Sequence, residues 1–392
     1  MVIEGPLTPL APGMVEHLKT LGYAPFTVGR QMWLIGKVSR FLQRRGLRAS
    51  EINPEVIKRF FGSVSAKGGP RLPTPKTLVW LVPHLRNIGV VPDPVLPPPQ
   101  CWEAEVVERY RPYLAAERGL APETVVEYVR SARLFLAEHP GRELKDLGVG
   151  DVSKFMTHHC RLLGPRSALL ATGLRSFLGF ALLEGLITVP LAGAVPSAAR
   201  WSGATLPRWL TPRQVAALLA SCDRRRPTGR RDYAILVLLI RLGLRAAEAA
   251  ALRLDDIDWR AGEIVVRGKG RTEQSLPLPS DVGAAITAYL RRGRPRRPER
   301  EVFLRALAPL RRLTPDGVSE VVRAASERAG LGSFGSHRLR HTAGTEMLRA
   351  GASLSEVAQV LRHRSIATTA IYAKVDHLAL RGLAMPWPGD LR

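Results

Sequence analysis

The stretch HRLRHTAGTEML at residues 337–348 places three basic side chains at the start of a segment with helical periodicity. In a helix, His337, Arg340 and His341 lie at positions i, i+3 and i+4, so they share one face. We expect Ser336 to cap this helix. A His–Arg–His face at a helix N-terminus is poorly suited to a hydrophobic core, and it is well suited to binding an anion.

The same two histidines have the i, i+4 spacing of zinc proteases, which makes a metal site the alternative interpretation. Arg338 stands where such an enzyme needs its catalytic Glu, and two arginines beside the imidazoles repel a cation. We therefore expect an anion at this face, with no metal and no cofactor.

Further basic residues lie upstream of this stretch. Gly243 ends an apolar segment, and Arg245 follows at a turn where it can either reach a ligand or pair with Glu248. Lys269 lies between two glycines, at the predicted tip of a hairpin whose strands are residues 264–266 and 275–278. Taken alone, Arg245 is more simply a structural ion pair and Lys269 a solvated turn residue.

Downstream, His363 lies at a predicted helix end, and Tyr372 follows nine residues later. The six residues together comprise two arginines, a lysine, two histidines and a tyrosine, with no paired carboxylates and no phosphate-cradling glycine loop. Such a set suits metal-free phosphoryl transfer, because guanidinium groups stabilise the charge of a pentavalent phosphate. A tyrosine oxygen can attack the phosphate and later leave it.

The composition favours a nucleic-acid partner. The 392 residues hold 58 Lys+Arg against 34 Asp+Glu, a formal charge of +24. Nucleic acid is the first candidate for such a chain and an anionic membrane surface the second. A GC-rich genome would explain the preference for Arg over Lys, but it would not explain the shortage of acidic residues.

Cysteine usage and hydropathy indicate a cytoplasmic protein without a membrane anchor. Cys101, Cys160 and Cys222 are far apart and match no disulfide or zinc spacing. Residues 1–20 lack the pattern of a signal peptide, and the longest apolar run, at 234–240, is far too short to span a bilayer.

Proline-rich stretches divide the chain. Residues 91–99 read VPDPVLPPP, and residues 195–209 form a second connector, which predicts segments 1–92, 100–195 and 205–392. The first two are predicted to be helical, and the third combines helices with two short strands. GYAPFTV at 22–28 resembles GLAPETV at 119–125, which suggests a duplicated helical unit.

Four stretches together resemble the catalytic domain of the tyrosine recombinase (phage integrase, Xer-like) family. They occur in the family's order and at a similar spacing: GLRAAEAAALRLDDID from 243, VRGKGRTEQSLPLP from 266, HRLRHTAGTEML from 337 and LRHRSIATTAIYAKVD from 361. The resemblance implies a mainly α fold with a small antiparallel β-sheet in a catalytic domain at 205–392, and a helical core-binding domain at 100–195.

The same resemblance implies roles for the six residues. Arg245 and Arg340 would hold the nonbridging oxygens, Lys269 would protonate the leaving 5′ oxygen, and Tyr372 would form a 3′-phosphotyrosyl bond. His337 would accept the nucleophile's proton, and His363 would hydrogen-bond the phosphate. The chain departs from the family at Arg362, where Gly is usual, and at Ser336, where Pro is common.

The resemblance also implies double-stranded DNA with specific recombination sites as the substrate, and a homo-oligomer that assembles through the apolar C-terminal tail. The basic runs at 224–226, 230–231 and 291–300 are either phosphate contacts or solvated loops. Integration or transposition of a mobile element is the expected role, and multimer resolution is the alternative. A type IB topoisomerase and a non-catalytic DNA-binding protein are the competing functions.

Overall fold

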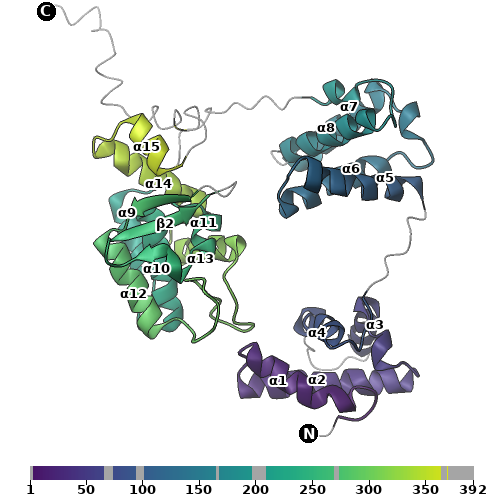
Figure 1. The fold of residues 1–392 in the computed structure, drawn as a ribbon, viewed down its shortest axis with the longest axis horizontal. Coiled ribbons are helices and arrows are strands. Elements are labelled where there is room, and N and C mark those ends of the chain that lie inside the picture. The colour runs from purple at the N-terminus through teal and green to yellow at the C-terminus, as the bar shows by residue number, and fades with distance from the viewer. Residues whose placement is uncertain are drawn as a thin grey trace, which may run out of the picture. The chain divides into compact units, whose positions relative to one another are not determined.

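The computed structural model describes residues 3–65, 74–93, 101–164, 167–196, 209–268, 273–362 and 369 (Figure 1). The chain divides into two compact units, one formed by residues 1–92 with 203–392 and the other by 93–202. Within the first unit, a backbone hydrogen bond runs from Leu310 N to Leu21 O (2.9 Å). Three of the predicted site residues, Lys269, His363 and Tyr372, lie outside the described residues.

The N-terminal segment is a small helical unit with its own core. Its α-helices are α1 (Ala11–Thr20), α2 (Pro25–Arg44), α3 (Pro54–Ser65) and α4 (Leu81–Asn87), and its short 3₁₀ turns are η1 (Thr8–Leu10), η2 (Ala49–Glu51) and η3 (Pro75–Leu78). Leu18, Ile35 and Phe60 are among the side chains that form a buried cluster between these helices. The long helix α2 supplies the largest share of this core, since it buries one whole face.

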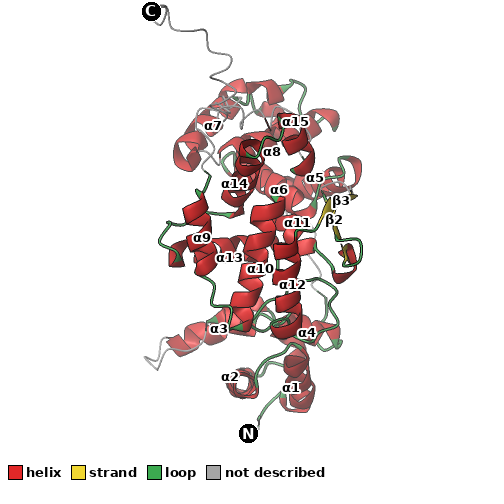
Figure 2. Ribbon diagram, turned by 90° about the vertical axis from the view of Figure 1, so that its left-hand side faces the viewer, coloured by secondary structure: helices red, strands yellow, loops and turns green. Residues whose placement is uncertain are grey.

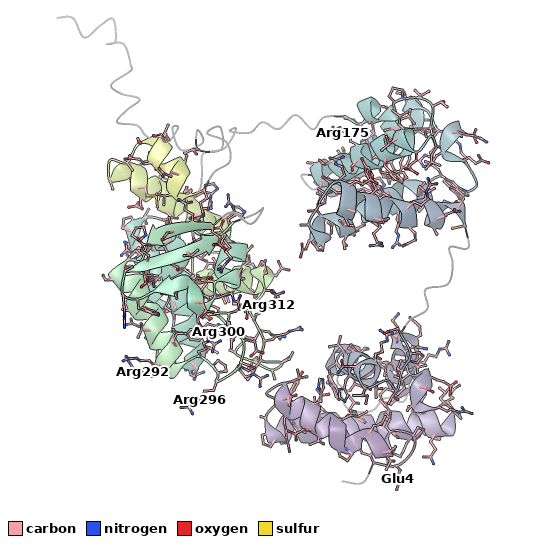
Figure 3. The ribbon with its side chains drawn as sticks, viewed as in Figure 1. Glu4, Arg175, Arg292, Arg296, Arg300 and Arg312 are labelled. Atoms are coloured by element: carbon pink, nitrogen blue, oxygen red, sulfur yellow. The ribbon has the colours of Figure 1, made fainter. Side chains whose placement is uncertain are left out.

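The unit formed by residues 93–202 is also helical. It contains α5 (Trp102–Pro112), the π-helical turn η4 (Tyr113–Glu117), α6 (Pro122–Ala137), η5 (Leu144–Asp146), α7 (Val149–Leu163), α8 (Ser167–Leu183) and η7 (Leu191–Ala194). Tyr110, Phe135 and Phe177 are fully buried at its centre. Arg175 on α8, labelled in Figure 3, donates to Val195 O (3.2 Å) and Pro196 O (2.8 Å), which ties the end of the unit to its core.

The third segment is α+β. Its helices are α9 (Pro212–Ala220), α10 (Pro227–Leu242), α11 (Ala246–Ala251), α12 (Ser280–Arg292), α13 (Pro315–Arg328), α14 (Ser336–Arg349) and α15 (Leu354–Val360), with the 3₁₀ turn η8 (Leu254–Asp256). Strands β1 (Ile257–Asp258), β2 (Glu263–Arg267) and β3 (Glu273–Pro277) form one antiparallel sheet in the order β1-β2-β3. The apolar helix α10 packs against α12, α13 and α14, and Figure 2 shows α10 and α12 side by side.

The fold class and two helix starts agree with the sequence. The prediction of a mainly α protein with a small antiparallel sheet is confirmed. Thr211 caps α9 and accepts from Gln214 N (3.3 Å), and Ser353 with Glu356 forms a capping box at the start of α15, as the Ser/Thr-x-x-Glu/Gln pattern predicts. No helix in the described ranges is both long enough and apolar enough to cross a membrane.

The predicted cap of α14 is wrong by one residue. The helix begins at Ser336 itself, and Gly335 is the N-cap. Gly335 O accepts the first turn's hydrogen bond from Arg338 N (3.1 Å). The Ser336 hydroxyl lies 3.5 Å from the Ser319 hydroxyl on α13, so its side chain contacts a neighbouring helix and does not cap its own.

Gly173 allows α8 to approach α6 closely. A Cβ atom added there would lie 2.5 Å from Ser131 Oγ, whereas one added at Gly179 on the same helix would meet nothing within 4 Å. We expect Gly173→Ala to lower the free energy of unfolding of this unit by about 1–3 kcal/mol through overpacking. Gly179→Ala should raise it by about 0.5–1 kcal/mol, because Ala is the better helix former. Urea unfolding of the full chain measures both, and equal effects of the two substitutions would contradict the packing argument.

Candidate active site

Arg245 is placed by the end of α10. Gly243 ends that helix in the left-handed conformation, with φ of 59°. A Cβ at Gly243 would lie 2.4 Å from Leu361 Cδ2, so only glycine lets the chain after α15 come this close. Arg245 then occupies the N-cap position of α11. The tight turn thus brings Arg245 beside the end of α15.

Glu248 is a buried carboxylate that fixes Arg245. Its side chain is 4% exposed. The Arg245 backbone N–H donates to Glu248 Oε2 (2.8 Å), and Arg245 Nη1 donates to Glu248 Oε1 (2.6 Å). Burial works to raise the pKa of Glu248, but the charge of Arg362 and the hydrogen bonds from Arg245 and Arg362 hold that pKa below its usual value. The carboxylate is therefore ionised and orients Arg245.

Arg362 is the second guanidinium on the same carboxylate. Its Nη2 donates to Glu248 Oε2 (2.8 Å), its Nη1 donates to Val360 O (2.8 Å), and its side chain is 9% exposed. Its φ is 56°, in the left-handed region where a non-glycine residue is disfavoured. The buried ion pair with Glu248 offsets this backbone cost.

Arg340 lies on α14 and is buried at 4% exposure. Its Nη1 donates to Gly243 O (2.6 Å), and its Nη2 donates to Leu361 O. Arg245 Nη2 in turn donates to Arg362 O (3.1 Å). The two arginines therefore bind consecutive carbonyl groups at residues 361 and 362, directly before His363.

The two histidines of α14 lie beside these arginines. Desolvation of the His337 ring and the positive charges of Arg340 and Arg245 lower its pKa. Desolvation, His337 and Arg340 likewise lower the pKa of His341. The mutual influence of His337, Arg340 and His341 agrees with their predicted shared helix face. Neutral imidazoles at pH 7 can accept a proton.

The structure describes the strands on either side of Lys269, up to residue 268 and again from residue 273. Arg267 on β2 pairs with Glu273 on β3, both in strand register and through a hydrogen bond from Arg267 Nε to Glu273 Oε1 (2.9 Å). Arg267 also forms an ion pair with buried Asp256. Residues 268–272 therefore connect two strands whose ends are fixed by ion pairs.

The basic run at 291–300 lies elsewhere. Arg230, in the first turn of α10, donates to Arg292 O (2.9 Å), whereas Arg245 follows the other end of this helix, which is about 24 Å long. Figure 3 shows Arg292 and Arg296 on the side of the segment away from α14 and α15. Arg294 binds backbone carbonyls and Arg300 pairs with Asp255, so part of the run serves the fold.

The arrangement can bind an anion such as a phosphate. Arg245 and Arg362 pair with the carboxylate of Glu248, and Arg340 binds the carbonyls of Gly243 and Leu361 beside them. Three guanidinium groups and one carboxylate leave a net positive charge next to two neutral imidazoles. Arg245 keeps 39% of its side chain exposed, so it can contact a ligand. Within the described ranges, no group of three or more His, Cys, Asp or Glu side chains could hold a metal ion.

Two members of this network are not among the predicted site residues. The sequence indicates Glu248 only as a structural partner of Arg245, and Arg362 only as a departure from the usual glycine. Their joint role depends on residues 248 and 362 meeting in space, and nothing in their separate sequence contexts predicts that contact. A basic residue where a left-handed glycine is usual is the one available signal.

The chain is similar to known recombinases. The sequence profile of the phage integrase family matches residues 208–378. The integrase/recombinase y4rA of Sinorhizobium fredii is 41% identical, with 99% of this chain and 96% of that protein aligned. Tyrosine recombinase XerD of Mycobacterium tuberculosis is 34% identical over 72% of this chain and 96% of its own length. In fold, the chain resembles a lambda integrase tetramer bound to a Holliday junction, with a TM-score of 0.56, 16% identity, and 78% and 87% of the two chains covered.

Removing the charge of Glu248 should destabilise the third segment. Glu248→Gln leaves Arg362 buried without a counter-charge, so we expect the free energy of unfolding to fall by about 3–5 kcal/mol. Adding Arg362→Gly should recover part of the loss, because the uncompensated cation is removed and glycine suits the positive φ. Urea unfolding of the single and double variants gives the coupling energy.

The matched control is Glu346→Gln on α14. Glu346 pairs with Arg349 at 3.1 Å, but both side chains are about half exposed. An exposed pair contributes about 0–1 kcal/mol. A loss at Glu248→Gln no larger than that at Glu346→Gln would contradict the proposed network.

The lowered histidine pKa values predict an acid-sensitive fold. The unfolded chain binds protons at His337 and His341 near the usual pKa of about 6.5, whereas the folded chain binds them only at lower pH. Protonation therefore favours unfolding, and stability should fall as the pH drops below about 6.5. The variant His337→Asn/His341→Asn should lose less stability than the wild type between pH 7.5 and 5.5, and identical pH profiles would count against this assignment.

Proposed function

Because this chain belongs to the phage integrase family of tyrosine recombinases, we propose that it cuts and rejoins DNA at specific sites through a 3′-phosphotyrosyl bond to Tyr372. The observation that carries this proposal is the binding of Arg245 and Arg340 to the carbonyls of residues 362 and 361. These contacts join three distant parts of the sequence, and they lie ten residues before Tyr372.

Each residue has a defined task in this proposal. Arg245 and Arg340 bind the nonbridging oxygens of the scissile phosphate, where negative charge concentrates in the transition state. His337 is neutral and accepts the proton of the attacking phenol. Lys269 protonates the leaving 5′ oxygen, and His363 hydrogen-bonds the phosphate. The tyrosyl bond conserves the energy of the phosphodiester, so religation needs no external energy source and no metal.

Glu248 and Arg362 act as positioning residues in this scheme. Glu248 Oε1 accepts a hydrogen bond from Arg245 Nη1, and the carbonyl oxygen of Arg362 accepts one from Arg245 Nη2. These contacts hold Arg245 in place through other protein groups, so little reorganisation is needed when the phosphate binds.

We propose double-stranded DNA with specific recombination sites as the substrate, and a homo-oligomer as the working form. The structural similarity to a lambda integrase tetramer bound to a Holliday junction supports this assembly. The apolar C-terminal tail that would join neighbouring protomers lies outside the described residues. Acting on DNA, the protein would work in the cytoplasm.

For the domains, we propose a helical extension at 1–92, a core-binding domain at 100–195 and a catalytic domain at 205–392. Three separate hydrophobic clusters support this division.

For the role, we propose integration or transposition of a mobile element. The match to XerD covers 72% of this chain, whereas the match to y4rA covers 99%. The part of this chain that has no counterpart in XerD therefore does have one in y4rA. Resolution of chromosome or plasmid multimers is the second candidate, favoured by the likeness to XerD.

Tyr372→Phe should bind DNA normally and form no covalent complex, because the change removes one oxygen and little packing. The assay uses nicked duplexes from the DNA that flanks the coding sequence, with denaturing gels to trap protein–DNA adducts. Tyr233→Phe, which removes the same atom from α10, serves as the matched control and should keep wild-type adduct yield. Adducts that persist in Tyr372→Phe would show that the nucleophile is misassigned.

Two outcomes of the same assay separate the competing functions. A non-catalytic DNA-binding protein would bind these duplexes but give no adduct with the wild-type chain. A type IB topoisomerase would relax a supercoiled plasmid that lacks any recombination site, whereas a site-specific recombinase requires its cognate sequence.

A further inference from the structure

The burial pattern of residues 3–93 recurs in residues 101–196 at a nearly constant separation. Along α2 and α6, buried positions repeat at a distance of 97 residues: Val28 and Val125, Met32 and Val129, Ile35 and Ala132, Val38 and Phe135. Along α3 and α7 they repeat at 95 residues: Ile52 and Leu147, Ile57 and Val152, Phe60 and Phe155, Phe61 and Met156. The 3₁₀ turns η2 and η5 precede these helices at the same separation.

The ends of the last helices repeat as well, down to single hydrogen bonds. After α4, Gly89 N donates to Arg86 O (2.9 Å) and Val90 N donates to Leu85 O (2.9 Å). After α8, 96 positions later in each case, Gly185 N donates to Leu182 O (3.1 Å) and Leu186 N to Ala181 O (2.8 Å). Both glycines have positive φ, 73° and 69°. The same glycine-ended turn also follows α1, α2, α13 and α14, so it supports the repeat only through its position, at nearly the separation found for the buried residues.

The starts of α2 and α6 match in the same way. Ala24 and Ala121 are extended N-cap residues with φ of −62° and −60°, and each is followed by proline at the first helical position. Gly22 and Gly119 precede them with positive φ. The two segments therefore follow one plan in three pairs of helices, α2 with α6, α3 with α7, and α4 with α8.

Their charges differ sharply. Residues 1–92 hold 13 Lys+Arg and 4 Asp+Glu, a net charge of +9, whereas residues 101–196 hold 11 of each and are neutral. Since the helical plan is the same, the extra charge is not needed to build the fold. Such a difference calls for an anionic partner of the N-terminal unit.

The extra charge gathers at one place on α2. Lys37, Arg40, Arg44 and Arg45 line a hollow of about 800 Å³, in which Glu4 is the one acidic lining residue. Lys37 and Arg40 stand where α6 has Leu134 and Ala137, and α2 continues for one turn beyond the end of α6. The three arginines are exposed. The ion pairs found in the described part of residues 3–93 are Lys19–Glu16 and Lys58–Glu55, so neither uses this cluster.

We propose that residues 3–93 are a second copy of the helical unit at 101–196, and that the cluster Lys37, Arg40, Arg44 and Arg45 binds the phosphate backbone of duplex DNA. The proposal rests on DNA being the substrate of the proposed function. Lys37, Arg40 and Arg44 recur every three or four residues along one side of a helix. This spacing suits contact with successive phosphates along one DNA strand. Arginine forks bind phosphate oxygens in a bidentate manner.

DNA is a better fit than a protein partner. The lining of the hollow carries four positive charges and one negative charge, and its large side chains include a single phenylalanine pair, Phe41 and Phe60, both buried. A protein interface has an apolar centre with few charges. Phosphate contacts need only exposed cations held in place, and the rigid helix α2 provides them.

The test compares full-length variants on a random-sequence duplex of about 40 base pairs, at several KCl concentrations. In Arg40→Gln/Arg44→Gln/Arg45→Gln we expect binding at least about tenfold weaker, and a salt slope shallower by about 0.9 for each phosphate that the protein no longer neutralises. The matched control, Lys19→Gln/Lys58→Gln/Arg59→Gln, removes the same charge from exposed positions outside the hollow and should stay close to wild type.

The variant Arg40→Lys/Arg44→Lys/Arg45→Lys keeps the charge and should retain most of the binding, which excludes misfolding as the cause of weaker binding in the glutamine variant. If the glutamine variant binds with the affinity and salt slope of its control, the proposal is wrong. Covalent adduct formation at saturating protein is measured in parallel. Adduct formation should persist in the glutamine variant. If the wild type forms no adduct, the proposed function is wrong, whereas the salt dependence still tests the DNA contact of the N-terminal cluster.

Discussion

The carboxylate of Glu248, buried between Arg245 and Arg362, is the interaction on which the site depends. A buried carboxylate is costly unless it is paired and hydrogen-bonded, and here both oxygens accept from guanidinium groups or from the backbone. The same contacts orient Arg245 and hold the end of α15 against the end of α10. The stability of this segment and the orientation of Arg245 therefore depend on the same ionised group, so a change at Glu248 affects both.

The ion pair with Glu248 explains how an arginine can occupy position 362. The usual glycine at this point satisfies the positive φ without strain, whereas arginine does not. In this chain the side chain gains a nearly buried ion pair with Glu248, and its carbonyl still receives Arg245. A third guanidinium thus enters the site without exposing a new charge to solvent.

The two helical units show a different kind of divergence. They share buried positions, turns and helix ends, yet one is neutral and the other carries a charge of +9. Buried positions are constrained by packing, so they change slowly, while exposed positions are free to acquire a new partner. In the proposed duplication, the new basic surface would extend the contact of the protein along its DNA.

The sequence by itself determined the element types, the shared face of His337, Arg340 and His341, and the family. These features depend on local periodicity, capping chemistry and motif order, all of which are written in neighbouring residues. Only the tertiary structure decided that Glu248 serves two arginines and that Arg362 joins the site. It also decided that Arg292, in the 291–300 run, contacts the first turn of α10, whereas Arg245 follows the other end of that helix. The reason is that these relations join residues far apart in the chain, and the packing of α10, α14 and α15 sets their distances.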